Sequence, residues 1–159
     1  MKLSNRKRSS VYNFVNILLL MFLAAGIGAY ILEKYRFNVL GKESLLLVAI
    51  PFCTAILYYL NGRQIFEYDS EGEALHFRNR NVFPFLQKSL NDEFPKYKLL
   101  KFDIINMFFV KRLYVTISSK NNGTTLLKYE VSYLRRKEIA DLRCSLNKVI
   151  KINNEKKSQ

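Results

Sequence analysis

Few side chains in this 159-residue sequence are of the types that perform chemistry. It has one histidine, His76, and two cysteines, Cys53 and Cys144, which lie far apart along the chain. A zinc site of the usual type brings several Cys and His ligands together, and three scattered residues cannot build one. No nucleophile lies at a recognisable spacing from a base, and no phosphate-binding glycine loop or HExxH helix occurs. The sequence therefore predicts a protein that is not an enzyme and holds no cofactor or metal.

The densest group of acidic side chains occupies alternate positions that begin at Glu67. Such carboxylates could coordinate a divalent cation through their oxygens. Their spacing does not follow the EF-hand pattern, however, and alternation with Phe66 and Tyr68 is typical of a β-strand with one solvated face. We favour the solvated face over a cation site. The group consists of Glu67, Asp69, Glu71 and Glu73.

Basic residues outnumber acidic ones throughout the chain. The formal net charge is +13, and after Gly62 there are 19 Lys and Arg against 11 acidic residues, which leaves +8. An excess of this size suits an anionic membrane surface or a nucleic acid. The aromatic residues fit a core or a membrane better than a base-stacking surface, so nucleic acid is not expected as a partner. Membrane lipid is the expected partner, with another membrane protein as the alternative.

Seven cations are candidates for contact with lipid or with a partner. They fall on expected strands and at the start of an expected C-terminal helix. Three of them oppose the dipole at that helix start, which favours a role other than helix stability. Ordinary solubility is the other explanation. The candidates are Lys98, Lys101, Lys111, Arg112, Arg135, Arg136 and Lys137.

Two long apolar segments lie near the N-terminus. Residues 11–32 carry no formal charge and would extend roughly 33 Å as a helix, enough to cross a bilayer core. Residues 44–60 are also uncharged and would extend roughly 25 Å, with a kink at Pro51. Only residues 33–43 join them, so the sequence predicts an antiparallel transmembrane hairpin. Pairs of small residues four positions apart are either the contact between the helices or a chance occurrence: Ala24 with Gly28, Ala25 with Ala29, and Ala49 with Cys53.

Charges beside the two spans predict their sidedness. Four cations precede the first span and Arg63 follows the second, whereas three cations lie in the loop between them. The positive-inside rule then favours both termini in the cytoplasm, as in a bacterial inner-membrane protein. A cleaved signal peptide is the alternative, because the small residues AAGIGA precede Tyr30. The uncharged run continues to Leu32 and a second span follows, so we expect no cleavage.

From residue 62 onward the apolar runs give way to alternation. The segment QIFEYDSEGEALHFRN predicts a β-hairpin with a turn at residues 70–73 and with His76 exposed as a structural residue. The segments LYVTISS and TTLLKYEV predict two more paired strands around an Asn-Gly turn at residues 120–123. We divide the chain into an N-terminal basic segment with the hairpin, residues 1–61, a β-rich cytoplasmic domain, residues 62–152, and a polar tail, residues 153–159.

An amphipathic helix is expected to close the domain. Ser132 is placed to cap its start. Apolar residues then recur at spacings of three and four, which predicts a stripe that packs on the domain. Cys144 lies beside this stripe and is expected to pack there. The stripe consists of Ile139, Leu142, Leu146, Val149 and Ile150.

Strands followed by one amphipathic C-terminal helix resemble the plan of small bacterial membrane proteins that carry a pleckstrin-homology-like (PH-like) domain. The resemblance covers about residues 44–151 by organisation and rests on the two membrane helices, EGEALHFRN, DEFPKYKLLKFDI, KRLYVTISSK and YLRRKEIADLRCSLNKVI. It implies a membrane α-helical hairpin plus an α+β domain, in which a bent antiparallel sheet is closed by the last helix. It implies this fold rather than a particular activity.

Two roles remain open at this point. The first is a membrane-anchored, non-enzymatic module that contacts anionic headgroups or a membrane protein. The second is an accessory subunit or assembly factor of a larger membrane complex. Neither paired carboxylates nor a nucleophile with its base favour a third role as an enzyme.

Overall fold

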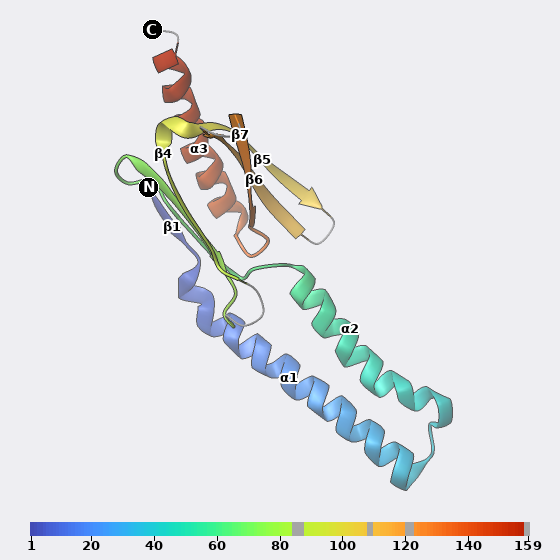
Figure 1. The fold of residues 1–159 in the computed structure, drawn as a ribbon. Helices are drawn as coiled ribbons and strands as arrows, with labels where there is room; N and C mark the ends of the chain where they lie inside the picture. Colours follow the sequence, from blue (N-terminus) through green and yellow to red (C-terminus); the bar gives the residue numbers. More distant parts are fainter. Residues whose placement is uncertain (84–87, 108–109, 120–122, 158–159) are drawn as a thin grey trace. The chain divides into compact units, whose positions relative to one another are not determined.

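The structure is a computed structural model that describes residues 1–83, 88–107, 110–119 and 123–157. It separates into two compact units (Figure 1). Residues Met1–Ser9 and Asn61–Gln159 form one unit, called the domain below, and residues Ser10–Leu60 form the helical hairpin. The first nine residues therefore fold with the domain, whereas the sequence pattern groups residues 1–61 together.

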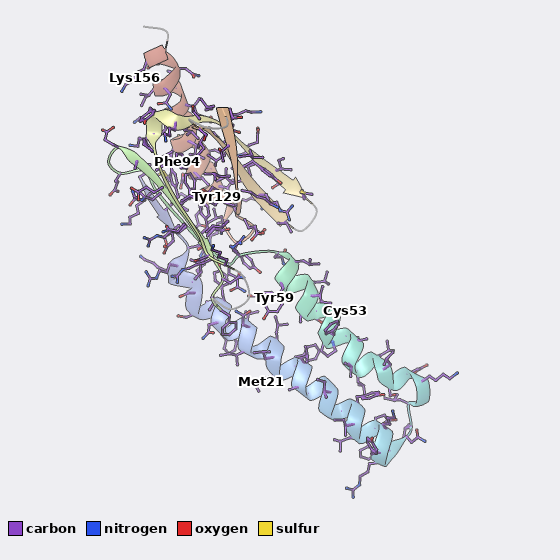
Figure 2. The ribbon with its side chains drawn as sticks, in the orientation of Figure 1. Met21, Cys53, Tyr59, Phe94, Tyr129 and Lys156 are labelled. Atoms are coloured by element: carbon purple, nitrogen blue, oxygen red, sulfur yellow. The ribbon has the colours of Figure 1, made fainter. Side chains whose placement is uncertain are left out.

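Two apolar helices form the hairpin. Both are long and apolar enough to cross a membrane, and only 11% and 6% of their most apolar windows are buried. A core helix of a soluble protein would be mostly buried, whereas here large side chains such as Met21 and Tyr59 are exposed (Figure 2). The bounds are Ser9–Leu32 for α1, Glu33–Phe37 for a π-helical turn, Gly41–Leu45 for a 3-10 turn, and Leu46–Leu60 for α2.

Helix α1 approaches α2 closely at Gly26. A Cβ atom at this position would lie 2.4 Å from the carbonyl oxygen of Leu47 and 2.8 Å from the ring of Pro51, so the contact requires glycine. A Cβ atom at Gly28 would meet nothing within 4 Å. A small residue does allow the close approach, but it is Gly26, which belongs to none of the three pairs, and for Gly28 the structure favours the chance explanation.

Within the described residues, seven strands and one long helix build the domain. The first four strands form one antiparallel sheet in the order β1-β2-β3-β4, and the last three form a second antiparallel sheet in the order β5-β6-β7. Both predicted strand pairs are present, although most of the predicted Asn-Gly turn lies outside the described residues. The bounds are Lys2–Ser4 for β1, Ile65–Asp69 for β2, Ala74–Arg80 for β3, Leu90–Pro95 for β4, Leu99–Met107 for β5, Val110–Ser119 for β6, Gly123–Glu130 for β7 and Arg136–Lys157 for α3.

A stack of aromatic rings joins the two sheets. Phe66 on β2 and Phe77 on β3 are almost fully buried, as their alternation predicts. The ring of Phe77 stacks on Tyr129 of β7, with ring centres 4.8 Å apart, and on Phe94 of β4, with ring centres 5.6 Å apart. Phe94 and Tyr129 can be followed in Figure 2. The core therefore lies between the sheets.

The predicted apolar stripe of α3 packs on the domain (Figure 1), where Leu142 and Leu146 are fully buried. The predicted N-cap, Ser132, is wrong because α3 begins four residues later and the Ser132 hydroxyl accepts the Lys111 N–H instead. Glu138 acts at the helix start, where its carboxylate accepts the Arg135 N–H at 2.7 Å.

The last turns of α3 also differ from the expectation. The helix runs to Lys157, beyond the residue at which a polar tail was expected to begin. Asn153 is buried, and its side-chain amide donates to the carbonyl oxygens of Lys96 and Leu99 at 2.8 and 3.0 Å. Cys144 is exposed rather than packed beside the stripe.

We expect Phe77→Ala to lower the free energy of unfolding of the domain by about 3–5 kcal/mol, because it empties the centre of the aromatic stack. Denaturant unfolding of the full chain in detergent, followed by near-ultraviolet circular dichroism, measures the change. Leu126→Ala is the matched control, since Leu126 is 61% exposed on β7, and it should stay within about 0.5 kcal/mol of the unmodified chain. An equal loss in both variants would contradict this core.

Alkaline pH should destabilise the domain through Tyr129. Burial raises the pKa of the Tyr129 hydroxyl, and donation to Asp92 at 2.8 Å raises it further. The unfolded chain loses this proton at about pH 10, so the stabilisation is complete below that pH and is lost as the pH rises above it. Unfolding across pH 8–12 should show a weaker alkaline loss for Tyr129→Phe. Identical slopes for the two chains would refute the assignment.

Candidate functional site

Strand β1 ties the start of the chain to the domain. It pairs antiparallel with β2, with Ser4 opposite Glu67. Asn5 extends the pairing, because its N–H donates to the carbonyl of Phe66 at 3.3 Å and its side-chain oxygen accepts the Phe66 N–H at 2.8 Å. The two segments that flank the hairpin in sequence are thus held side by side in one sheet.

A buried polar network surrounds this junction. Asn5, Gln64 and Asn79 are each exposed by 2% or less. The Asn5 amide donates to the Gln64 carbonyl, and the Asn79 amide donates to the carbonyls of Ile65 and Glu130. The Asn79 side-chain oxygen also accepts the Glu130 N–H at 3.0 Å. Because a buried amide without partners costs about 1–3 kcal/mol, the network fixes how these segments meet.

Two ion pairs hold the same region. Arg63 lies 3.1 Å from Glu130, with side chains only 13% and 11% exposed. Gly62 has a φ of +84°, and a Cβ atom there would lie 2.6 Å from the carboxylate carbon of Glu130. Arg8, the residue before α1, pairs with Glu138 in the first turn of α3. Removing one partner of such a pair leaves a poorly solvated charge, so both pairs resist separation.

We call this region the attachment end of the domain. The chain leaves the domain at Ser9 and returns to it at Asn61. Lys111 and Arg8 belong to this end because both bond to residues 131–133, the segment that leads into α3. The attachment end comprises residues 5–9, 61–64, 79, 111–112 and 130–138.

The candidate basic residues divide between two ends of the domain. Lys111 and Arg112 begin β6 and lie at the attachment end together with residues 135–137, which lead into and begin α3. Lys98 and Lys101 lie elsewhere, where β5 begins and the Asn153 amide bonds to the Leu99 carbonyl. The seven candidates therefore do not form one patch.

The five candidate cations at the attachment end form no ion pair with any residue that the structure describes. Residues 135–137 are exposed, and Lys111 and Arg112 are partly exposed. The two carboxylates of this end are already engaged, Glu130 by Arg63 and Glu138 by Arg8. The attachment end thus presents uncompensated positive charge. Lys101, by contrast, lies 2.9 Å from Asp103.

Within the acidic group, the carboxylate of Asp69 is engaged by a backbone donor and lies near a cation. The Glu71 N–H donates to the Asp69 carboxylate at 2.8 Å, and this bond, with the nearby charge of Lys2, lowers the pKa of Asp69. His76 is partly exposed and lies 3.4 Å from Glu93. Among the described residues, no group of three His, Cys, Asp or Glu could hold a metal ion. These contacts fit the solvated face that the sequence favours.

Sequence reasoning missed both β1 and the network behind it. The alternation of Lys2, Leu3 and Ser4 is a signal for a strand, but three residues are too few to separate it from chance. Asn5 and Asn79 carry no signal at all, because the groups that satisfy them come from distant parts of the chain.

We expect Asn79→Ala to lower the free energy of unfolding by about 1–3 kcal/mol, since it leaves two buried carbonyls and one buried N–H without partners. Asn91→Ala is the matched control, because Asn91 is exposed on the neighbouring strand and bonds only to Arg78 among the described residues. Thermal unfolding of the full chain in detergent compares the two. A cost at Asn91 as large as at Asn79 would contradict the importance of the network.

No protein-family model matches the sequence, and comparison with curated proteins and with solved structures also gives no match. The geometry and charge of the chain itself are therefore the evidence for its function.

Proposed function

We propose that this chain is an integral membrane protein whose domain is a non-enzymatic, PH-like module that contacts anionic lipid headgroups of its own membrane. The observation that carries the proposal is that the five candidate cations at the attachment end form no ion pair with any described residue. The apolar hairpin supports the anchorage.

Chain connectivity keeps these cations close to the membrane. Arg63 follows Leu60, the last residue of α2, by three positions, which is about 11 Å at full extension. Arg8 directly precedes α1 and donates to the carbonyl oxygen of Tyr133, next to the cations at the start of α3. Each cation held near an anionic surface contributes on the order of 1 kcal/mol, so five of them outweigh thermal energy several times over.

The pairing of β1 with β2 supports a location of both termini on one face of the membrane. If both helices span the bilayer, the segments on either side of the hairpin emerge on the same side, as the pairing of Ser4 with Glu67 requires. Cleavage of the first span as a signal peptide would remove β1, Asn5 and Arg8 from the domain. The excess of cations at this face favours the cytoplasm of a bacterium.

The arrangement of strands supports the PH-like plan. Antiparallel strands followed by a closing C-terminal helix support this plan, although the strands form two sheets of four and three strands where the resemblance implies one bent sheet. The hairpin then lies between the first and second strands of the domain in sequence, so it would interrupt a PH-like domain rather than precede it.

A second candidate role is an accessory subunit of a membrane complex. It is favoured by small residues on α1 that do not pack against α2 and could contact another helix. Ala24 and Ala25 are exposed, and a Cβ atom at Gly28 would meet nothing within 4 Å. Purification in mild detergent followed by chemical cross-linking tests this role. A solitary monomer would count against it.

Hydrogen exchange of the full chain in nanodiscs tests the lipid contact. We expect residues 130–138 to exchange more slowly when the nanodiscs contain phosphatidylglycerol than when they contain phosphatidylcholine alone, and we expect high salt to abolish the difference. Neutralising residues 135–137 as Arg135→Gln, Arg136→Gln and Lys137→Gln should remove about 3 kcal/mol of attraction and most of the effect.

The pair Lys98→Gln and Lys101→Gln serves as the control, because these residues belong to the candidate set but lie away from the attachment end. This variant should keep the full response to phosphatidylglycerol. Exchange that is indifferent to the lipid charge in the unmodified chain would contradict the proposed function.

A further inference from the structure

Apolar side chains are exposed where β5 turns into β6. Ile105 is 46% exposed and Met107 is 50% exposed. Met107 pairs with Val110 in the last described register pair of the two strands. The intervening Phe108 and Phe109 lie outside the described residues and are not included. We call Ile105, Met107 and Val110 the tip patch.

Cations flank the tip patch directly. Lys111 follows Val110 on the strand and so points to the opposite face of the sheet, whereas Arg112 lies opposite Ile105 in the strand register and shares its face. A guanidinium nitrogen of Arg112 lies 3.7 Å from the sulfur of Met107. The tip patch and the guanidinium of Arg112 therefore share one face of the sheet at this turn, and Lys111 adds a positive charge on the other face.

Strand register places the tip patch at the attachment end. Arg112 lies opposite Glu130, whose carboxylate is bound by Arg63, three residues beyond α2. Met107 and Val110 extend the sheet past this row, and the carbonyl of Lys111 accepts the Val131 N–H at 2.8 Å. The tip patch thus lies at the end of the domain to which the membrane hairpin is tethered.

The small size of the tip patch determines which kind of partner it can bind. A stable protein interface buries about 800 Å² on each partner, which two half-exposed side chains cannot supply. The boundary between headgroups and acyl chains needs no such area, because it accepts apolar side chains next to cations that bind the headgroup phosphates. We propose that Ile105 and Met107 insert into this boundary while Lys111 and Arg112 contact the phosphates, which deepens the proposed function and rests on it.

Depth-dependent quenching of an environment-sensitive dye tests the insertion. The dye is attached through Met107→Cys in a full-length chain that also carries Cys53→Ser and Cys144→Ser, reconstituted into phosphatidylglycerol-containing vesicles. The control is Leu126→Cys in the same background, because Leu126 is 61% exposed on the same sheet. We expect brominated acyl chains to quench the dye at position 107 and to leave the dye at position 126 unquenched.

Equal quenching at the two positions, or none at position 107, would overturn the insertion. Shielding of position 107 from aqueous iodide without quenching by bromolipid would also overturn it and would indicate a protein partner or a second copy at the tip. If position 107 is not quenched while residues 130–138 still respond to phosphatidylglycerol, insertion fails and headgroup contact stands. If neither responds, both fail.

Discussion

The pairing of the first residues of the chain with β2 is the constraint on which the rest of the structure depends. It brings together two segments that are separated by the whole hairpin, and it is closed by the buried amides of Asn5 and Asn79. A strand of three residues contributes little by itself. Its strength comes from the polar network and the two ion pairs behind it, since any displacement would leave buried groups without partners.

The pairing of β1 with β2 links the helical hairpin to the positive charge of the attachment end. Because Arg8 and Arg63 engage Glu138 and Glu130, they neutralise the carboxylates of the attachment end and leave the remaining cations without an internal partner. Under the proposed function, the same residues that join the domain to the hairpin also leave a positive surface toward the lipid. The exposed Ile105 and Met107 extend that surface with apolar groups.

Local patterns in the sequence predicted much of the fold. The alternation around Phe66 and the spacing of Leu142 and Leu146 depend only on neighbouring residues, so the strands and the helix stripe are confirmed. The Ser132 cap is wrong and the helix contact forms at Gly26 rather than at Gly28, because each depends on which distant group lies there. Strand β1 and the placement of the basic residues at two ends of the domain also depend on tertiary pairing. A single sequence does not reveal that pairing.

A disulfide trap tests the pairing most directly. The chain would carry Ser4→Cys and Glu67→Cys in place of its two native cysteines, each changed to serine, and would be oxidised in intact membranes. The two positions face each other across antiparallel strands, where a disulfide fits. The structure predicts an intramolecular cross-link, seen as a joined peptide by mass spectrometry, and none for Ser4→Cys with Glu71→Cys. Failure of the first pair to join, or equal joining of both, would contradict the account.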